Sequence, residues 1–186
     1  MVPESVDQKL RFARTRLDDL KGLIEDNRLA ADPDARHQLT QEFFLHVVGA
    51  IEYPAQLVNE RRSLCLASED VAVYKVVNEI EKRDPSDPLV VLLKGLSADT
   101  RKTALPADPY SEEGFVYRTI NYRNEVSHRN INPFHFRLSA GPKIGFLWLD
   151  PRDHALGQST RPVDADLSSM FSVVDQRCRV VLEVLR

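Results

Sequence analysis

The stretch YRNEVSHRN, residues 122–130, gathers side chains that can handle phosphate groups and protons. Arg123, Asn124 and His128 lie within six positions, and Arg129 follows directly. Cutting RNA through its own 2′-hydroxyl needs a base, an acid and positive charge near the phosphorane. Histidine titrates near neutral pH and can serve as base or acid, and arginine binds phosphate oxygens through a planar fork. These residue types therefore favour metal-free RNA cleavage.

The surrounding segment is basic although the chain as a whole is acidic. The net charge is −3 over 186 residues and the isoelectric point is about 6.0, which gives no bulk indication of nucleic-acid binding. Between residues 118 and 143 there are five cations against one acid, a formal charge of +4 without the histidines. A phosphate-binding surface requires such a region. We therefore expect nucleic acid to bind at Arg118, Arg129, Arg137 and Lys143, around a catalytic set of Arg123, Asn124 and His128.

Helix geometry complicates this catalytic set within a single chain. A helix turns by 100° per residue, so Arg123 and His128 lie about 140° apart on a regular helix. Either the helix ends or bends before His128, or the two side chains meet across a dimer. The cleavage needs two proton transfers, and a single chain offers only one histidine of this motif for them. A two-fold dimer supplies two arginines and two histidines to one cleft. We therefore expect a homodimer.

The run Arg123-Asn124-Glu125-Val126-Ser127-His128, near the end of a predicted helix, resembles the signature of the HEPN superfamily. These small helical bundles carry an Arg, four to six residues and a His, often with a polar residue directly after the Arg. The resemblance implies a metal-independent endoribonuclease of the toxin–antitoxin, phage-defence or RNA-processing type, active as a dimer with the motif at the interface. It implies RNA as substrate, no cofactor, no metal, and an antitoxin or other operon partner protein. Some relatives have lost the activity, so the alternative is a catalytically inactive module that binds RNA, nucleotide or a protein partner.

The chain departs from the family pattern at one position. In toxins silenced by a partner nucleotidyltransferase, a Tyr typically lies two residues after the His and is modified there. Here His128 is followed by Arg129 and Asn130. We therefore do not expect that mode of control.

Hydrophobic periodicity predicts an all-α fold, an antiparallel helical bundle of five to six helices in one domain over residues 1–186. The predicted helices cover residues 5–30, 35–62, 69–82, 88–102, 110–129 and 164–185. Pro54 is expected to kink the second helix. The expected start signals are Ser5 or Asp7, Ser68, Ser86 with Pro88, and Ser111 or Asp108. The stretch with Arg123 thus lies near the end of the fifth helix.

An alternating pattern interrupts the helices at about residues 133–150. In FHFRLS the apolar residues alternate with polar ones, AGPK is typical of a turn, and IGFLWLD resumes an extended pattern. This predicts a β-hairpin inserted before the C-terminal helix. Its aromatic residues Phe134, Phe136 and Trp148 are suited to stacking on bases, although packing in the core is the simpler interpretation.

The chain carries no recognisable export or membrane signal. Its N-terminus is charged from residue 4 onward, and no stretch approaches the roughly 18–20 apolar residues needed to cross a bilayer. The two cysteines, Cys65 and Cys178, lack metal-site spacing and are typical of free thiols in a cytosolic protein. We therefore expect a cytoplasmic protein without membrane association.

Simpler interpretations of the same residues stay open. Cations near a helix C-terminus are favoured by the helix dipole, whatever the function. Glu42 and His46 have the spacing of a metal pair, but without a third ligand an exposed i,i+4 contact is the simpler interpretation. The first helix carries an apolar stripe that is either an internal packing seam or the interface of a structural assembly subunit. Its residues are Val6, Leu10, Ala13, Leu17, Leu20 and Ile24.

Overall fold

The computed structural model describes residues 3–26, 28, 32–98, 106–129, 134–137, 145–148 and 162–186. The α-helices in these residues are α1 (Pro3–Glu25), α2 (Pro33–Arg61), α3 (Val73–Arg83), α4 (Pro88–Lys94), α5 (Glu112–Arg129) and α6 (Val163–Val184). A 3-10 turn at Ser68–Asp70 precedes α3. The all-α class predicted from the sequence is confirmed.

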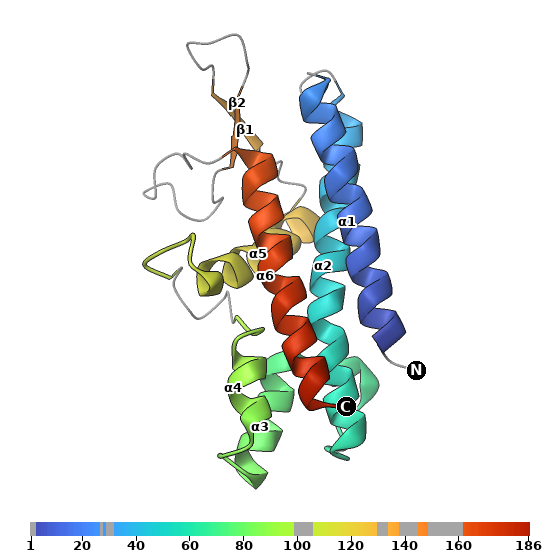
Figure 1. The fold of residues 1–186 in the computed structure, drawn as a ribbon, viewed down its shortest axis with the longest axis vertical. Coiled ribbons are helices and arrows are strands. Elements are labelled where there is room, and N and C mark those ends of the chain that lie inside the picture. The colour runs from blue at the N-terminus through green and yellow to red at the C-terminus, as the bar shows by residue number, and fades with distance from the viewer. Residues whose placement is uncertain are drawn as a thin grey trace.

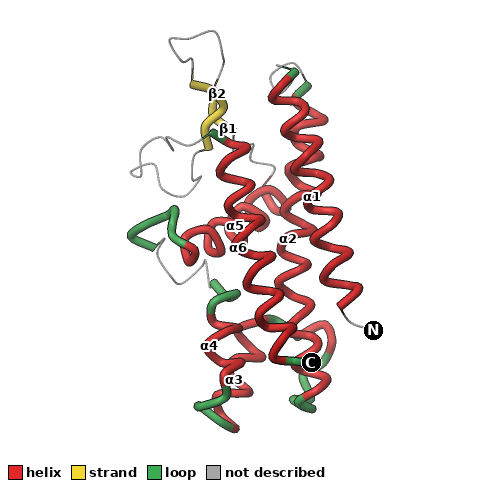
Figure 2. The backbone as a smooth tube through the Cα atoms, in the orientation of Figure 1, coloured by secondary structure: helices red, strands yellow, loops and turns green. Residues whose placement is uncertain are grey.

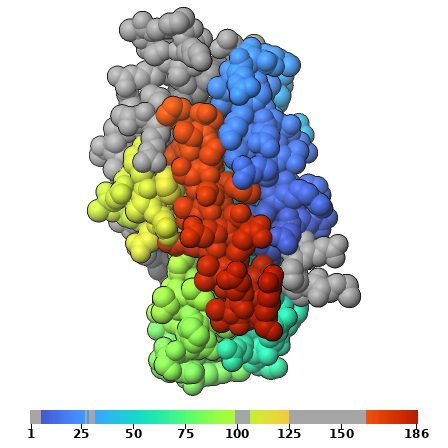
Figure 3. All heavy atoms as spheres, viewed as in Figure 1, coloured from blue at the N-terminus to red at the C-terminus, as the bar shows by residue number. Residues whose placement is uncertain are grey.

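Three long helices form the body of the bundle. α1 and α2 run side by side in opposite directions, and α6 lies along both of them (Figure 1). α5 crosses this body and packs against α2 and α6, whereas α3 and α4 pack against each other near the end of α6. On the face shown in Figure 3, α6 fills the surface between α1 and the segments of α4 and α5. The position of α5 therefore depends on its contacts with two other helices.

The apolar stripe of α1 is an internal packing seam. Five of its six residues are at most 3% exposed, and Ile24 is partly buried against the core. The five are Val6, Leu10, Ala13, Leu17 and Leu20. They join buried residues of α2 and α6, among them Phe43, Phe44, Ile51, Leu167 and Val174. Burial of these apolar side chains is the main favourable contribution to folding. The stripe is thus filled within the chain, and the interpretation as a free assembly seam loses its basis.

Polar side chains cap three of the helices, α2, α4 and α5, as local capping rules require. The Gly114 amide donates to the Ser111 hydroxyl at 3.1 Å, which confirms Ser111 as the cap of α5. The Leu89 amide donates to the Asp87 carboxylate at 2.9 Å, so the cap of α4 is Asp87 and the prediction of Ser86 is wrong. The Ser86 hydroxyl instead donates to the carboxylate of a neighbouring turn residue.

Three further predicted boundaries are wrong. α1 already includes both Ser5 and Asp7, so neither caps it. Ser68 begins the 3-10 turn, and α3 starts later without a side-chain cap. α4 ends directly before Gly95, well short of residue 102, because glycine is a poor helix former. α2 continues through Pro54 as one helix, and the kink expected at Pro54 stays a prediction.

Two short strands occupy part of the predicted hairpin insertion. β1 (Phe134–Arg137) pairs with β2 (Gly145–Trp148) in antiparallel register (Figure 2). Residues 138–144 between them lie outside the described residues, so a hairpin that joins the strands stays a prediction. The side chains of the aromatic residues on these strands lie outside the described set as well, and their role also stays a prediction.

Gly114 lies where the preceding loop folds over the first turn of α5. A Cβ placed on Gly114 would be 2.5 Å from the carbonyl oxygen of Asp108 and 2.6 Å from the carbonyl carbon of Pro109. These are backbone atoms, so the loop itself would have to move. In α1, by contrast, a Cβ placed on Gly22 would meet no atom within 4 Å. The two glycines therefore differ in whether the fold requires them.

The substitution Gly114→Ala should lower the free energy of unfolding by roughly 1–3 kcal/mol, the usual cost of overpacking. The matched control Gly22→Ala should raise it by about 0.5–1 kcal/mol, because alanine is the better helix former. Urea unfolding followed by circular dichroism measures both changes. Effects of the same sign in the two variants would contradict the close approach at Gly114.

Candidate functional site

α5 carries the predicted catalytic stretch, and its middle is buried on nearly every side. Its buried polar side chains are those of Arg118, Thr119 and Asn121. The Thr119 hydroxyl donates to a carbonyl one turn back at 2.7 Å. Neither the nitrogen nor the oxygen of the Asn121 side-chain amide has a hydrogen-bond partner in the part of the chain that the structure describes. Exposure returns at Arg123 and Asn124, which are half-buried. The candidate chemistry therefore begins where α5 leaves the core.

Arg118 is an ion-pair partner in the core. The residue is only 3% exposed. Its guanidinium forms a two-pronged contact with Asp166 of α6, in which Nη1 donates to Oδ1 at 3.1 Å and Nη2 donates to Oδ2. Nη1 also donates to the Pro109 carbonyl at 3.3 Å and Nη2 to the Tyr122 hydroxyl at 3.5 Å. Burial acts to lower the pKa of Arg118, but Tyr122 and Asp166 outweigh it, so the pKa lies above its usual value.

These contacts bear on the predicted nucleic-acid-binding set. The donors of Arg118 are directed at groups inside the fold, and a phosphate at the surface has no route to them. Arg118 is one of the five cations in residues 118–143, but its charge is already paired with Asp166. We therefore exclude Arg118 from the surface that would bind nucleic acid.

Arg123 lies in a surface depression between α1, α2 and α5. Nη1 of Arg123 donates to Oδ1 of Asn124 at 3.1 Å. The depression has a volume of ≈ 210 Å³ and is lined by Lys9, Leu45, Val48, Gly49, Glu52, Tyr53, Gln56 and Arg123. A guanidinium and a lysine ammonium thus border the same space. Such a pair is suited to an anion with several oxygens.

His128 follows on the same helix. α5 runs through both His128 and Arg129 without a break, so the helix does not end before His128. On a regular helix, positions 123 and 128 lie about 140° apart. The side chains of His128, Arg129 and Arg137, and all of Lys143, lie outside the described residues, and their roles stay predictions. Of the predicted catalytic residues, the structure brings Arg123 and Asn124 into contact.

Sequence reasoning missed the residues that line the depression with Arg123, above all Lys9 and Glu52. No local sequence pattern predicts this set, because it depends on how α1, α2 and α5 pack. One signal was present, since Gly49 lies in the middle of α2, where glycine weakens a helix and often marks a close approach. The Lys9 side chain occupies that space, with Cδ 3.4 Å from a Cβ placed on Gly49.

His46 lies on α2 with its ring centroid 5.2 Å from that of Phe12. Burial is the largest cause that lowers the pKa of His46, Lys9 adds to this, and Glu42 opposes it. The Glu42 carboxylate pairs with Arg16 at 2.7 Å. No group of three or more metal-ligating side chains occurs in the part of the chain that the structure describes. His46 is therefore best described as a neutral, half-buried packing residue.

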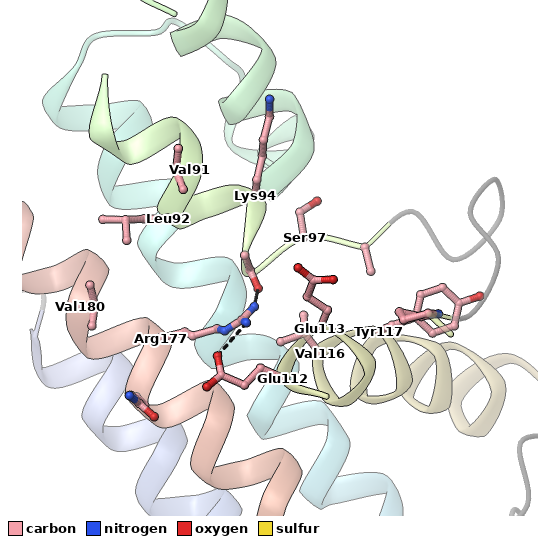
Figure 4. A pocket seen from close by; sticks show the side chains of 14 residues that line it. Val91, Leu92, Lys94, Ser97, Glu112, Glu113, Val116, Tyr117, Arg177 and Val180 are labelled. Atoms are coloured by element: carbon pink, nitrogen blue, oxygen red, sulfur yellow. Dashed lines mark hydrogen bonds and ion pairs between the residues drawn. The ribbon is translucent and has the colours of Figure 1, made fainter. Parts of the chain in front are cut away.

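A larger depression lies where α4, α5 and α6 meet. It has a volume of ≈ 730 Å³, and much of its wall is apolar, including Val91, Val116 and Val180. Arg177 of α6 points between the end of α4 and the start of α5 (Figure 4). Its Nη2 donates to Glu112 at 2.9 Å, and its Nη1 donates to the carbonyl of the glycine that ends α4. Among the described residues that line this space, none was predicted to act in catalysis or nucleic-acid binding.

No family model, no curated protein and no solved structure matches the chain. Among the described helices, none is both long and apolar enough to cross a membrane. The similarity to the HEPN superfamily therefore stays a prediction that residues 123–128 carry.

The substitution Arg118→Met should lower the free energy of unfolding by about 3–5 kcal/mol, because it leaves the Asp166 carboxylate buried without a partner. The double variant Arg118→Met/Asp166→Leu should regain most of that loss, since both charges are then absent. Arg179→Met is the matched control, because it removes an exposed ion pair of α6 and should cost less than about 1 kcal/mol. Urea unfolding measures all three. A loss after Arg118→Met as small as in the control would mean that the buried pair does not hold α5 on α6.

Acidification should destabilise the protein in part through His46. The folded-state pKa of His46 lies below its ordinary value of 6.5, so the unfolded chain takes up the proton first as the pH falls. The free energy of unfolding should therefore decrease from pH 7 to pH 5, and decrease less in His46→Gln. Comparing urea midpoints of the two proteins at both pH values tests this. An equal decrease in both would show that His46 is not the group responsible.

Proposed function

We propose that the chain is a HEPN-like, metal-independent endoribonuclease that cleaves RNA by attack of the 2′-hydroxyl. The observation that carries this proposal is the position of Arg123. Its guanidinium borders a solvent-accessible depression, its Nη1 is held by Asn124 at 3.1 Å, and His128 follows five positions later on the same helix. The planar guanidinium of Arg123 lies beside a second cation, Lys9, and both groups can bind the oxygens of a phosphodiester.

Each proposed catalytic residue has a separate chemical role. Arg123 binds the non-bridging phosphate oxygens and stabilises the charge of the phosphorane. Asn124 positions Arg123 through the hydrogen bond to its Oδ1. His128 transfers protons to and from the reacting oxygens. Arg129, Arg137 and Lys143 bind the neighbouring phosphates of the RNA.

The proposal includes a homodimer, and the continuous course of α5 supports it. Because the helix is continuous through position 128, positions 123 and 128 of one chain lie about 140° apart around the helix axis. A two-fold axis near the end of α5 would let Arg123 of one chain act with His128 of the other. A role as toxin, phage-defence or RNA-processing enzyme, and an antitoxin or operon partner, are part of the proposal through the resemblance alone.

A second candidate function is a catalytically inactive module that binds RNA, nucleotide or a protein partner. The depression between α4, α5 and α6 favours it, because ≈ 730 Å³ falls within the range of about 300–1,000 Å³ typical of ligand sites. That depression also lies apart from Arg123. A purified protein that binds RNA or nucleotide tightly and never cuts RNA would favour this second function.

The substitution His128→Ala should reduce RNA cleavage by about 10²- to 10⁴-fold, the usual contribution of a proton-transferring group. Arg123→Lys should also fail, because lysine keeps the charge and loses the planar fork. His37→Ala is the matched control and should cut RNA at the wild-type rate. Cleavage of a labelled RNA is measured in EDTA, where the products should end in a 2′,3′-cyclic phosphate and the corresponding DNA should stay intact.

Mixing His128→Ala with Arg123→Ala subunits tests the shared cleft. Mixed dimers that regain part of the activity would support a site built from both chains, and sedimentation equilibrium at high micromolar concentration measures the dimer itself. The proposal is wrong if His128→Ala cuts as fast as the wild type, or if EDTA abolishes cleavage.

A further inference from the structure

We propose that Lys9 of α1 and Arg123 of α5 together bind one phosphate group of an RNA chain. The choice of RNA rests on the proposed ribonuclease function, whereas the phosphate chemistry rests on the depression itself. The two residues lie 114 positions apart in the sequence, and both line the space of ≈ 210 Å³ above α2. Lys9 is thus a second phosphate-binding residue beside the predicted motif.

Gly49 allows Lys9 to reach this space. A Cβ placed on Gly49 would lie 3.4 Å from Cδ and 3.5 Å from Cε of Lys9, so the lysine stem packs directly over the backbone of α2. α1 and α5 both pack against α2, and most residues that line the depression belong to α2. The surface of α2 therefore forms the floor, and the two cations approach it from neighbouring helices.

The balance of charges in the depression favours the binding of an anion. Neither Lys9 nor Arg123 forms an ion pair with an acid among the described residues. On the same α1, by contrast, Arg16 pairs with Asp19 and Glu42 at 2.7 Å each. Two like charges that border one space repel each other, and a bound phosphate would relieve this repulsion.

The size and remaining lining of the depression fit one phosphate with part of its nucleotide. A volume of ≈ 210 Å³ corresponds to roughly seven waters at about 30 Å³ each. Tyr53 and Gln56 offer an aromatic ring and an amide, the groups that stack on bases and bind their edges. Glu52 is the one acid among these lining residues, and its negative charge disfavours a second phosphate in the same space.

The salt dependence of RNA binding tests this inference. Binding of a single-stranded RNA oligonucleotide is measured in a His128→Ala background, which blocks cleavage. Lys9→Met keeps the stem over Gly49 and removes the charge, so the slope of log affinity against log salt should fall by about 0.7. The affinity lost between 50 and 200 mM salt should then be roughly two- to threefold smaller. Lys21→Met, on the same helix but outside the depression, should leave the slope unchanged.

A second variant tests the path of the lysine stem. Gly49→Leu fills the space over α2 and should weaken RNA binding as Lys9→Met does, although no charge is removed. Circular dichroism shows whether this variant keeps its helices. If it does not fold, Lys9→Met alone decides, since that substitution lies on the surface and keeps the bulk of the side chain.

Several outcomes would overturn the inference. They are an unchanged slope in Lys9→Met, an equal fall in Lys21→Met, no RNA binding by the wild type, and inorganic phosphate that binds as tightly as the oligonucleotide. Failure of the ribonuclease proposal is distinguishable from these outcomes. Binding that depends on Lys9 without any cleavage would refute only the ribonuclease, whereas cleavage with an unchanged slope would refute only the role of Lys9.

Discussion

The buried pair of Arg118 and Asp166 is the constraint on which the position of α5 depends. An arginine that is 3% exposed is tolerated only when its charge and its donors are satisfied, and here Asp166 of α6 accepts from both terminal nitrogens. The same side chain donates to the loop before α5 through the Pro109 carbonyl. One residue therefore ties together the loop, α5 and α6. Such a pair adds less to stability than apolar packing would, but it specifies one rotation of α5 about its axis.

That rotation decides where the candidate site lies. Arg123 follows Arg118 by five positions, so a regular helix turns it about 140° away from the core pair, and it lines the depression over α2. The loop before α5 packs tightly on the first turn of that helix, because a side chain on Gly114 would collide with the backbone of the loop. Arg177 adds a second link by joining the start of α5 to the end of α4. The site at Arg123 thus depends on contacts made well away from it.

Gly49 in α2 also leaves the space in which the candidate site lies. Glycine at position 49 weakens α2 locally, but it lets the Lys9 stem cross the helix and border the same space as Arg123. The stem of Lys9 packs over Gly49, and Asn124 holds the Arg123 guanidinium at one nitrogen. A point charge and a planar fork are complementary ways to hold a phosphate.

The amino-acid sequence by itself determined the helical class, the order of the long helices, the apolar stripe of α1 and two candidate caps for α5, Ser111 and Asp108. These features depend on residues a few positions apart, which periodicity and capping rules describe. It also singled out Arg123 with Asn124. It could not separate Arg118 from Arg123, because the two arginines differ only in what meets them, and Asp166 lies 48 residues further along the chain. Only the tertiary structure decided that Arg118 is buried and that Lys9 and Arg123 line one depression, since both results depend on how distant helices pack.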